Sequence, residues 1–344
     1  MDGVSALDMR ALNRALLARQ LLLEPGDTSL PAALEQVAGI QAQYAPAMYV
    51  GVSTRLAGFE RDSLTRALEE RTVIQATLMR STIHLVSAAD YWPFAVAVRQ
   101  ARRESWLRAV RGPTAAQMAG AARKLRPRLA DGPLHRKQIE ELLGKEIARG
   151  VGLWLDMVRV PPSGTWEHRR ADLYAAAGDW IAPVKITPAK AIEHLVRSYL
   201  RGFGPASRAD VASFTGLKLS DLTAVLKRID PIRHRSADGN ELFDLPDAPL
   251  PDPDTPAPVR FLPVWDATLL VHARRTGILP EDLRPRVFHV RNPHGTATFL
   301  VDGAVAGAWR YEDGAVALDP WVKLDRATRR ALDGEAERLA AFHG

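Results

Sequence analysis

The sequence contains no cysteine among its 344 residues. This absence excludes disulfide bonds, zinc sites built on thiolates and cysteine nucleophiles, and it removes any argument for an oxidising compartment. No stretch approaches the roughly 18 consecutive apolar residues that a membrane-spanning helix needs. Residues 1–20 form a charged amphipathic pattern, which differs from a secretory signal peptide. We therefore expect a cytoplasmic protein that is not embedded in a membrane.

Two other kinds of binding motif are missing. The chain has no glycine-rich loop of the dinucleotide or nucleotide type. Its closest histidine pair, His289 and His294, has no obvious third and fourth ligand beside it, as a zinc site would require. We therefore expect neither a metal ion nor a cofactor.

Charged residues are numerous, and the basic ones are in moderate excess. Lys and Arg number 46 against 40 Asp and Glu, which gives a formal net charge of +6. Such an excess permits phosphate binding without proving it. The distribution is more informative, because the arginines gather in clusters: Arg99, Arg102, Arg103 and Arg108, then Arg169 and Arg170, Arg233 and Arg235, and Arg274 and Arg275.

Hydrophobic spacing predicts an α+β fold that is predominantly helical. Apolar residues at helical spacing predict helices over 6–23, 30–37, 47–56 and 61–70. β-branched residues then fill 72–86, with a break near Arg80, which predicts a hairpin. Helices followed by a hairpin are the plan of a winged-helix unit. We therefore assign residues 1–112 to a first winged-helix unit.

The same order of elements recurs twice, without a detectable sequence repeat. A second winged-helix unit is predicted over 113–186, where helices near 135–149 lead into a strand at 155–160. A third unit over 187–245 ends in a wing that turns at 237–240. Its predicted helices cover 189–201, 207–214 and 219–229. The fold is thus expected to contain tandem winged-helix units.

A small β-rich C-terminal module is expected after these units. Six prolines and three aspartates mark 246–258 as a linker, because proline cannot donate to a helix or a central strand. The module covers 259–344, with a strand at 259–265 and a hairpin at 296–310. A final helix is predicted over 325–342.

The segment 38–46 carries the most distinctive polar pattern. Gly39 frees the backbone, and Pro46 biases the residue before it away from the α region, so the segment is expected to be partly extended. In extended chain Gln41 and Gln43 project to one side, where two amides can hold one water molecule. The alternative is that these glutamines cap helix ends or lie in solvent.

Several motifs together resemble the AlkZ-like (YcaQ-like) winged-helix DNA glycosylases. They are spread over every predicted unit, which makes the resemblance far more specific than the glutamine pattern alone. The motifs are GIQAQY at 39–44, LMRSTIHLV at 78–86, VRVPP at 158–162 with GTWE at 164–167, YLRGFGPA at 199–206, LPVWD at 262–266 and FLVDG at 299–303.

This resemblance implies a catalytic role for Gln41 and Gln43, because the family places a Gln-x-Gln or Gln-x-Asp motif beside the scissile glycosidic bond. A glutamine amide has no useful pKa, so it can orient water but cannot act as a strong base. The expected substrate is therefore a cationic alkylated purine such as N7-alkylguanine, in bulky or crosslink-type lesions. The motif holds no lysine, so a monofunctional, monomeric glycosylase acting on double-stranded DNA is expected. The alternative is a non-catalytic winged-helix DNA-binding protein or regulator.

The remaining candidate residues are expected to bind DNA. By the resemblance, Arg80, Thr82 and His84 lie on a hairpin near the active cleft, while Tyr44 follows the glutamine motif and is a candidate for contact with the lesion. The candidates for phosphate contact elsewhere are Arg159, Arg169, Arg170, Arg233 and Arg235, with His272, Arg274 and Arg275 at a hairpin or loop tip that would enter the minor groove.

The double substitution of Arg274 and Arg275 by alanine is expected to weaken DNA binding across all sequences. Each lost phosphate contact should lower the dependence of log K on log salt concentration by roughly one unit, and the pair by up to about 2. Affinity measurements over a salt series check this, and an unchanged slope would place the loop away from DNA.

Overall fold

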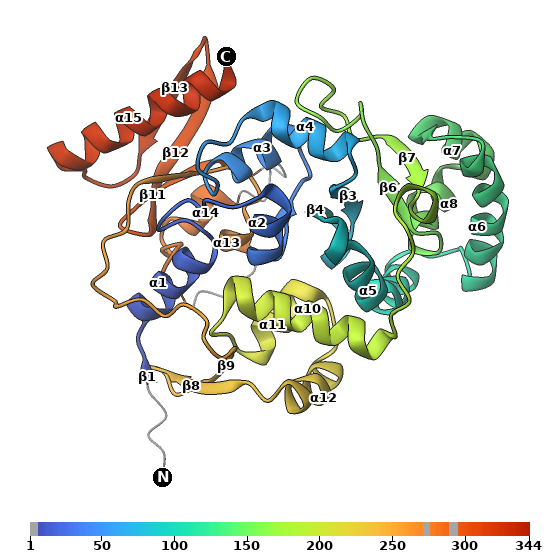
Figure 1. Ribbon diagram of the computed structural model, residues 1–344, viewed down its shortest axis with the longest axis horizontal. Helices are drawn as coiled ribbons and strands as arrows, with labels where there is room; N and C mark the ends of the chain where they lie inside the picture. The colour runs from blue at the N-terminus through green and yellow to red at the C-terminus, as the bar shows by residue number, and fades with distance from the viewer. Residues whose placement is uncertain (1–5, 271–275, 289–294) are drawn as a thin grey trace.

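The computed structural model describes residues 6–270, 276–288 and 295–344 (Figure 1). About 48% of the chain is helical and 17% is strand, so the expected α+β fold with predominant helix is confirmed. In the described part of the chain, no helix is long and apolar enough to cross a membrane. Some residues singled out above lie outside the described ranges: His272, Arg274, Arg275, His289 and His294.

The first helices and the first hairpin form as the hydrophobic spacing predicts. α2 (Leu30–Gln36) begins after Ser29, whose hydroxyl caps the helix by accepting a backbone N–H. β3 (Val73–Thr77) and β4 (Ile83–Ser87) pair in an antiparallel hairpin, and the expected break between them is the short 3-10 turn η1 (Met79–Ser81). The other helices of this part are α3 (Ala45–Ser53), α4 (Arg61–Glu69) and α5 (Ala88–Ala109).

Two predicted helix boundaries are wrong. α1 (Met9–Arg19) is shorter than the predicted 6–23, because β1 (Ala6–Leu7) pairs as a strand and Asp8 then caps the helix. α3 begins at Ala45, so the prediction that Pro46 keeps its predecessor out of the helix is also wrong. Proline is tolerated in a first helical turn, where its missing N–H has no intrahelical partner to lose.

One antiparallel sheet spans the first and second predicted units. Its order is β2-β4-β3-β6-β7-β5, and the pairing of β3 with β6 joins the two units at Ala76 and Val158. The other strands of this sheet are β2 (Ile40–Gln41), β5 (Leu134–His135), β6 (Met157–Arg159) and β7 (Leu173–Ala176). Figure 1 shows three helices beside β7: α6 (Ala115–Ala130), α7 (Arg136–Leu143) and α8 (Lys145–Gly150). The short η2 (Val151–Leu153) and α9 (Ala177–Trp180) belong to the same part of the chain.

The third predicted unit has its own small sheet. The wing consists of β8 (Ile232–Ser236) and β9 (Glu241–Asp244), as the turn residues predict. β1 adds to it by pairing parallel to β8, so the start of the chain completes this sheet. The helices are α10 (Pro188–Phe203), α11 (Arg208–Thr215) and α12 (Leu219–Ile229), the last with the predicted bounds.

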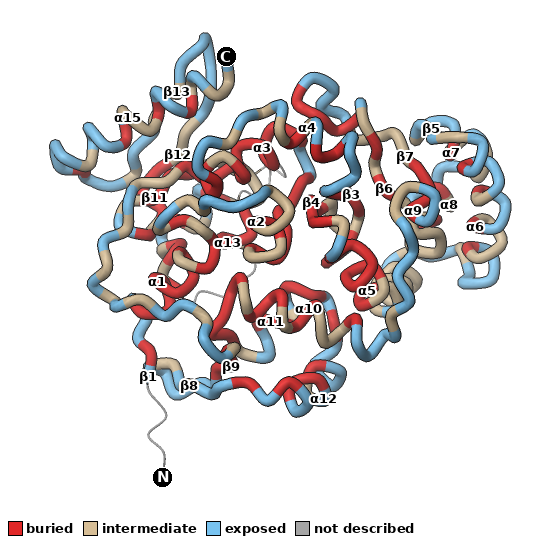
Figure 2. The backbone as a smooth tube through the Cα atoms, viewed as in Figure 1, coloured by how far each residue is buried: buried red, intermediate tan, exposed pale blue. Residues whose placement is uncertain are grey.

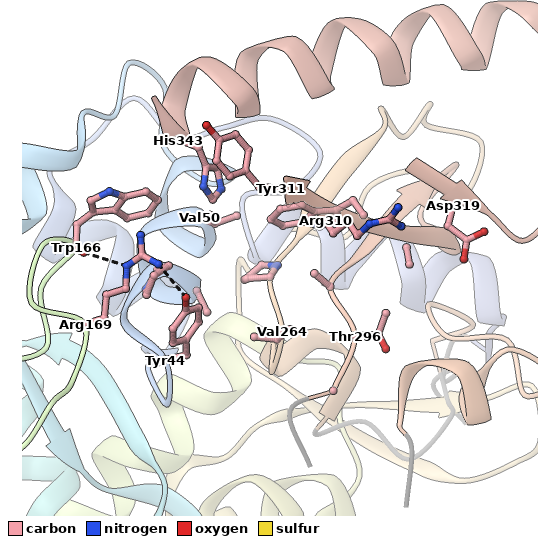
Figure 3. Close-up of a pocket in the computed structure, with 17 residues that line it drawn as sticks. Tyr44, Val50, Trp166, Arg169, Val264, Thr296, Arg310, Tyr311, Asp319 and His343 are labelled. Atoms are coloured by element: carbon pink, nitrogen blue, oxygen red, sulfur yellow. Dashed lines mark hydrogen bonds between the residues drawn. The ribbon is translucent and has the colours of Figure 1, made fainter. Parts of the chain in front are cut away.

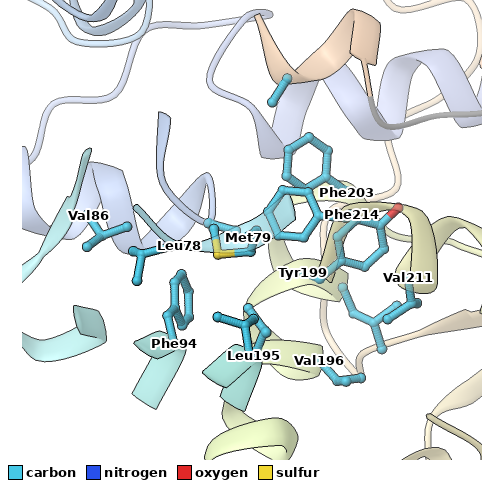
Figure 4. Close-up of a cluster of buried hydrophobic side chains, with 14 of the residues drawn as sticks. Leu78, Met79, Val86, Phe94, Leu195, Val196, Tyr199, Phe203, Val211 and Phe214 are labelled. Carbon is cyan, nitrogen blue, oxygen red and sulfur yellow. The ribbon is translucent and has the colours of Figure 1, made fainter. Parts of the chain in front are cut away.

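The main core lies between the first hairpin, α5 and α10. Aromatic rings from α5, α10 and α11 gather there with Met79 of the hairpin turn (Figure 4). The rings of Tyr199 and Phe203 are stacked with centroids 5.3 Å apart, and that of Phe214 lies 5.0 Å from Tyr199. In Figure 2 the buried residues concentrate along these same helices and strands. This packing fixes the hairpin turn against α11.

The C-terminal module is a four-stranded antiparallel sheet with a helix against it. The strand order is β10-β11-β12-β13, and the last strand was not predicted. Residues 246–258 contain no helix or strand, as their prolines predict. The elements are β10 (Arg260–Leu262), α13 (Ala267–Leu270), α14 (Arg284–Val287), β11 (Thr298–Val301), β12 (Ala304–Glu312), β13 (Ala315–Pro320) and α15 (Arg326–His343).

Buried ion pairs hold α1 against distant parts of the chain. Arg19 is fully buried and donates to both carboxylate oxygens of Asp244, at 2.6 and 2.8 Å. Arg14, also buried, donates to the carboxylate of Asp302 in the turn of the C-terminal hairpin. These contacts join α1 to the third unit and to the C-terminal module.

The substitution Asp244→Ala is expected to lower the free energy of unfolding by about 3–5 kcal/mol, because it leaves the Arg19 guanidinium buried without its counter-charge. Urea unfolding measures this change. The matched control is Glu312→Ala, which removes an exposed partner of Arg310 and should change stability little. Equal effects of the two substitutions would contradict the assignment of Arg19 and Asp244 as a structural pair.

Candidate active site

The glutamine segment is extended, as its sequence predicts. β2 pairs with β4 at Ile40 and Gln41, and Ala42 N–H continues the ladder by donating to the Ile83 carbonyl at 2.8 Å. Gly39 turns the chain into this strand with φ +81°. A Cβ there would lie 2.9 Å from Val86 Cγ1, so the close approach of the two strands requires glycine.

Both glutamine amides bond to the β3–β4 turn, at different depths. Gln41 is only 6% exposed, and its Oε1 accepts from Arg80 Nη2 at 3.1 Å. Gln43 is exposed, and its Oε1 accepts from the Ile83 backbone N–H at 2.8 Å. Because an N–H donor must face an oxygen, these contacts fix the orientation of each amide. Each oxygen keeps one lone pair for a further hydrogen bond.

Arg80 positions Gln41 and docks the turn on α11. Its backbone has φ 52°, a left-handed conformation that reverses the chain between the two strands. The guanidinium donates to the Phe214 carbonyl at 2.8 Å and lies 5.3 Å from the centre of that ring. Burial lowers the pKa of Arg80 to about 10, so it remains charged at neutral pH.

His84 and Thr82 lie beneath this turn. His84 is 2% exposed, and its Nδ1–H donates to the Thr82 carbonyl at 3.0 Å. Burial, and then the charge of Arg80, lower the pKa of His84 to about 3, so the ring is neutral at physiological pH. The Thr82 hydroxyl donates to the Met79 carbonyl at 3.1 Å. Both side chains therefore stabilise the turn, and their contact with DNA stays a prediction.

A cavity of about 270 Å³ opens beside Gln43. No carboxylate lines it among the described residues, whereas arginines reach it from α5, α7, α8 and β6. Arg159, a predicted phosphate contact, donates to Thr77 Oγ1 at 3.0 Å and to Tyr174 Oη at 3.5 Å. The lining side chains are Gln43, Thr77, Ser81, Ile83, Arg102, Arg136, Ile139, Ala148, Arg149, Gly152, Leu153, Met157, Arg159 and Tyr174.

Arg102 was not predicted as a site residue. It belongs to the arginine cluster of α5, and burial lowers its pKa to about 10. Its buried Nε has no hydrogen-bond partner within the described residues. The only signal in the sequence was the i, i+3 spacing of Arg99 and Arg102, which puts both on one face of a helix.

Tyr44 lines a second and larger cavity, of about 640 Å³ (Figure 3). In extended chain neighbouring side chains point to opposite sides, so Gln43 faces the arginine-lined cavity and Tyr44 faces this one. Aromatic rings line it: His343 stacks on Tyr311 with centroids 4.2 Å apart, and Trp166 packs edge-on against His343 with centroids 5.2 Å apart. Burial lowers the pKa of His343 to about 4. The glutamine segment thus separates two cavities of different chemistry.

The other predicted arginines are exposed and lie apart from the glutamine amides. Arg169 lies nearest, since its Nη1 donates to Tyr44 Oη at 3.4 Å. Arg170 pairs with Asp172 in the same loop. Arg233 pairs with Glu241 on the β8–β9 wing of the third unit, where Arg235 donates to the Gly239 carbonyl at 3.2 Å. Their contacts with DNA remain predictions.

Comparisons with known proteins relate the chain to one enzyme family. The family model described as DNA glycosylase AlkZ-like matches residues 34–342. Among solved structures, the DNA glycosylase AlkZ of Streptomyces sahachiroi is similar with a TM-score of 0.83, over 98% of this chain and 97% of that chain. The two sequences are 18% identical, so this likeness shows a shared fold. A comparison with curated protein sequences gives no match.

The low pKa of His84 predicts that the free energy of unfolding depends on pH. An unfolded histidine titrates near about pH 6.5, so below that pH the unfolded chain binds a proton that the folded chain does not. The free energy of unfolding should therefore fall as the pH falls from about 6.5 towards 3. His84→Asn, which keeps a donor for the Thr82 carbonyl, should reduce this slope by up to about 1.4 kcal/mol per pH unit.

Urea unfolding at a series of pH values measures the slope. The control is His168→Asn, because this residue is exposed and its hydrogen bonds to the described residues are made by its backbone N–H and carbonyl. A His84→Asn variant with the slope of the parent protein would contradict the assigned burial of the neutral ring.

Proposed function

We propose that this chain, which belongs to the AlkZ-like DNA glycosylase family, hydrolyses the N-glycosidic bond of cationic alkylated purines in double-stranded DNA. The observation that carries the proposal is the exposed amide of Gln43, whose oxygen accepts from Ile83 N–H and beside which the described residues place no carboxylate. The substrate class includes N7-alkylguanine, with bulky and crosslinked adducts as candidates.

The absence of an acid or base beside Gln43 supports this choice of substrate. A glutamine amide cannot take a proton from water, but its oxygen can orient water towards the sugar and stabilise developing positive charge. His84 cannot protonate a leaving base, since it is buried and neutral. An N7-alkylated guanine already carries positive charge and departs as a neutral base, so it needs no acid.

The two glutamines are proposed to have different roles. Gln43 is exposed and presents its amide to the substrate, whereas Gln41 is buried and held by Arg80. Gln41 therefore acts mainly by supporting the geometry of the motif. No lysine lines either cavity in the described part of the chain, which favours attack by water over a Schiff base. The proposed enzyme is thus monofunctional and leaves an abasic site.

The DNA-binding surface is proposed to use tandem winged-helix units. The hairpins β3–β4 and β8–β9 each follow helices in the chain, as wings do, and the exposed Arg233 and Arg235 lie on the second of these. We propose that the protein acts as a monomer without a cofactor. A non-catalytic DNA-binding protein would need no amide beside the glycosidic bond, so base release separates the two functions.

Gln43→Ala is expected to abolish release of N7-methylguanine from a duplex under single-turnover conditions. DNA affinity should stay within about 1 kcal/mol, because the amide acts on the transition state rather than on phosphates. Gln41→Ala should reduce the rate by less. Full activity of the double variant would contradict the mechanism, and absence of release by the parent protein would contradict the proposed function.

Matched duplexes test the role of substrate charge. Uracil and 8-oxoguanine should be released at least about 100-fold more slowly than N7-methylguanine, since a general acid is typically worth that much or more. Similar rates for charged and uncharged bases would mean that an acid takes part.

A further inference from the structure

We infer that the cavity beside Gln43 is a phosphate site, in which Arg102 and Arg159 hold one backbone phosphate of the DNA. This inference rests on the proposed function for the identity of the nucleic acid. It assigns an occupant to a cavity that the glycosylase chemistry itself does not use.

The charges of the cavity are not balanced by the protein. Arg136 pairs with Glu140 at 2.8 Å, but no carboxylate among the described residues pairs with Arg159 or Arg102. Asp156, whose charge raises the pKa of Arg102, makes its ion pair with Arg99, at 2.8 Å. Arg102 and Arg159 are half-buried, and an anionic ligand in the cavity would supply the charge that no direct ion pair gives them.

The hydrogen bonds of the two arginines are also incomplete. Among the described residues, Arg159 bonds only to neutral oxygens, those of Ala171, Thr77 and Tyr174. Arg102 Nε is buried and has no partner within the described ranges. Buried donors in folded proteins are almost always satisfied, so this donor indicates a missing acceptor. The acceptor must be anionic to balance the charge.

A phosphate diester fits these donors better than a purine cation does. The guanidinium groups of Arg102 on α5 and Arg159 on β6 can each donate to a different phosphate oxygen, because a planar guanidinium presents its N–H groups in a fixed geometry. The same charges would repel a cationic alkylated base, which excludes the cavity as the base pocket. Because Gln43 lies on its edge, the phosphate held here is one that flanks the target nucleotide.

The test uses duplexes without an alkylated base, so its outcome does not depend on base release. Each duplex carries a stable abasic-site analogue and one neutral methylphosphonate linkage, which is moved along both strands. Binding is measured by fluorescence anisotropy for the parent protein, for Arg102→Met and for Arg108→Met. The control Arg108 lies on the same helix, but its side chain is 69% exposed and outside the cavity.

When one linkage near the abasic site is made neutral, binding of the parent protein should weaken about tenfold. Binding of Arg102→Met should weaken clearly less, because only Arg159 still holds that phosphate. Arg108→Met should keep the pattern of the parent protein. Arg102→Lys serves as a milder second variant, because it keeps the charge but loses the planar set of N–H donors. Its binding should be weakened by the same neutral linkage to an intermediate extent. Unfolding curves establish that each variant is folded.

The inference is overturned if no linkage distinguishes the parent protein from either Arg102 variant. A further arm titrates inorganic phosphate against the parent protein without DNA. Arg102→Met could remove binding of inorganic phosphate although no neutral linkage affects this variant and the parent protein differently. In that case the cavity binds a free anion, and the assignment to DNA is wrong.

Discussion

The pairing of β2 with β4 is the constraint on which the candidate site depends. The short ladder through Gln41 and Ala42 sets the direction in which the glutamine segment crosses the hairpin. It also brings Ile83 N–H to the amide of Gln43 and the turn residue Arg80 to that of Gln41. A slip of one residue would turn both amides to the other face. The register of this ladder therefore determines that the amide of Gln43 reaches the edge of the cavity.

The ionisable side chains around Gln41 and Gln43 keep one charge state around neutral pH. Burial lowers the pKa of His84 to about 3, whereas Arg80 and Arg102 remain cationic with pKa values near about 10. The amides do not titrate at all. The described surroundings of Gln43 thus combine permanent cations with neutral dipoles. The proposed reaction at such a site would depend on positioning and electrostatics, with no protein group beside Gln43 to transfer a proton among the described residues.

Much of the secondary structure could be predicted, because its causes are local. The amphipathic spacing of α12 and the turn residues of the β8–β9 wing act within a few residues. The sheet shared by β3 and β6 could not be predicted, since its partners lie about eighty residues apart and carry no local signal. The extended glutamine pair was predictable from Gly39, but the greater burial of Gln41 depends on Arg80 and α11. Arg102 is visible in the sequence only as one of several clustered arginines.

The ion pairs of α1 also bear on how the chain is made. Arg14 lies 288 positions before its partner Asp302, and Arg19 lies 225 before Asp244. The ribosome therefore synthesises α1 long before either carboxylate leaves the exit tunnel. β1 likewise cannot pair until β8 has been made. During synthesis, α1 therefore stays without two of its final ionic partners until the chain has been made through Asp302.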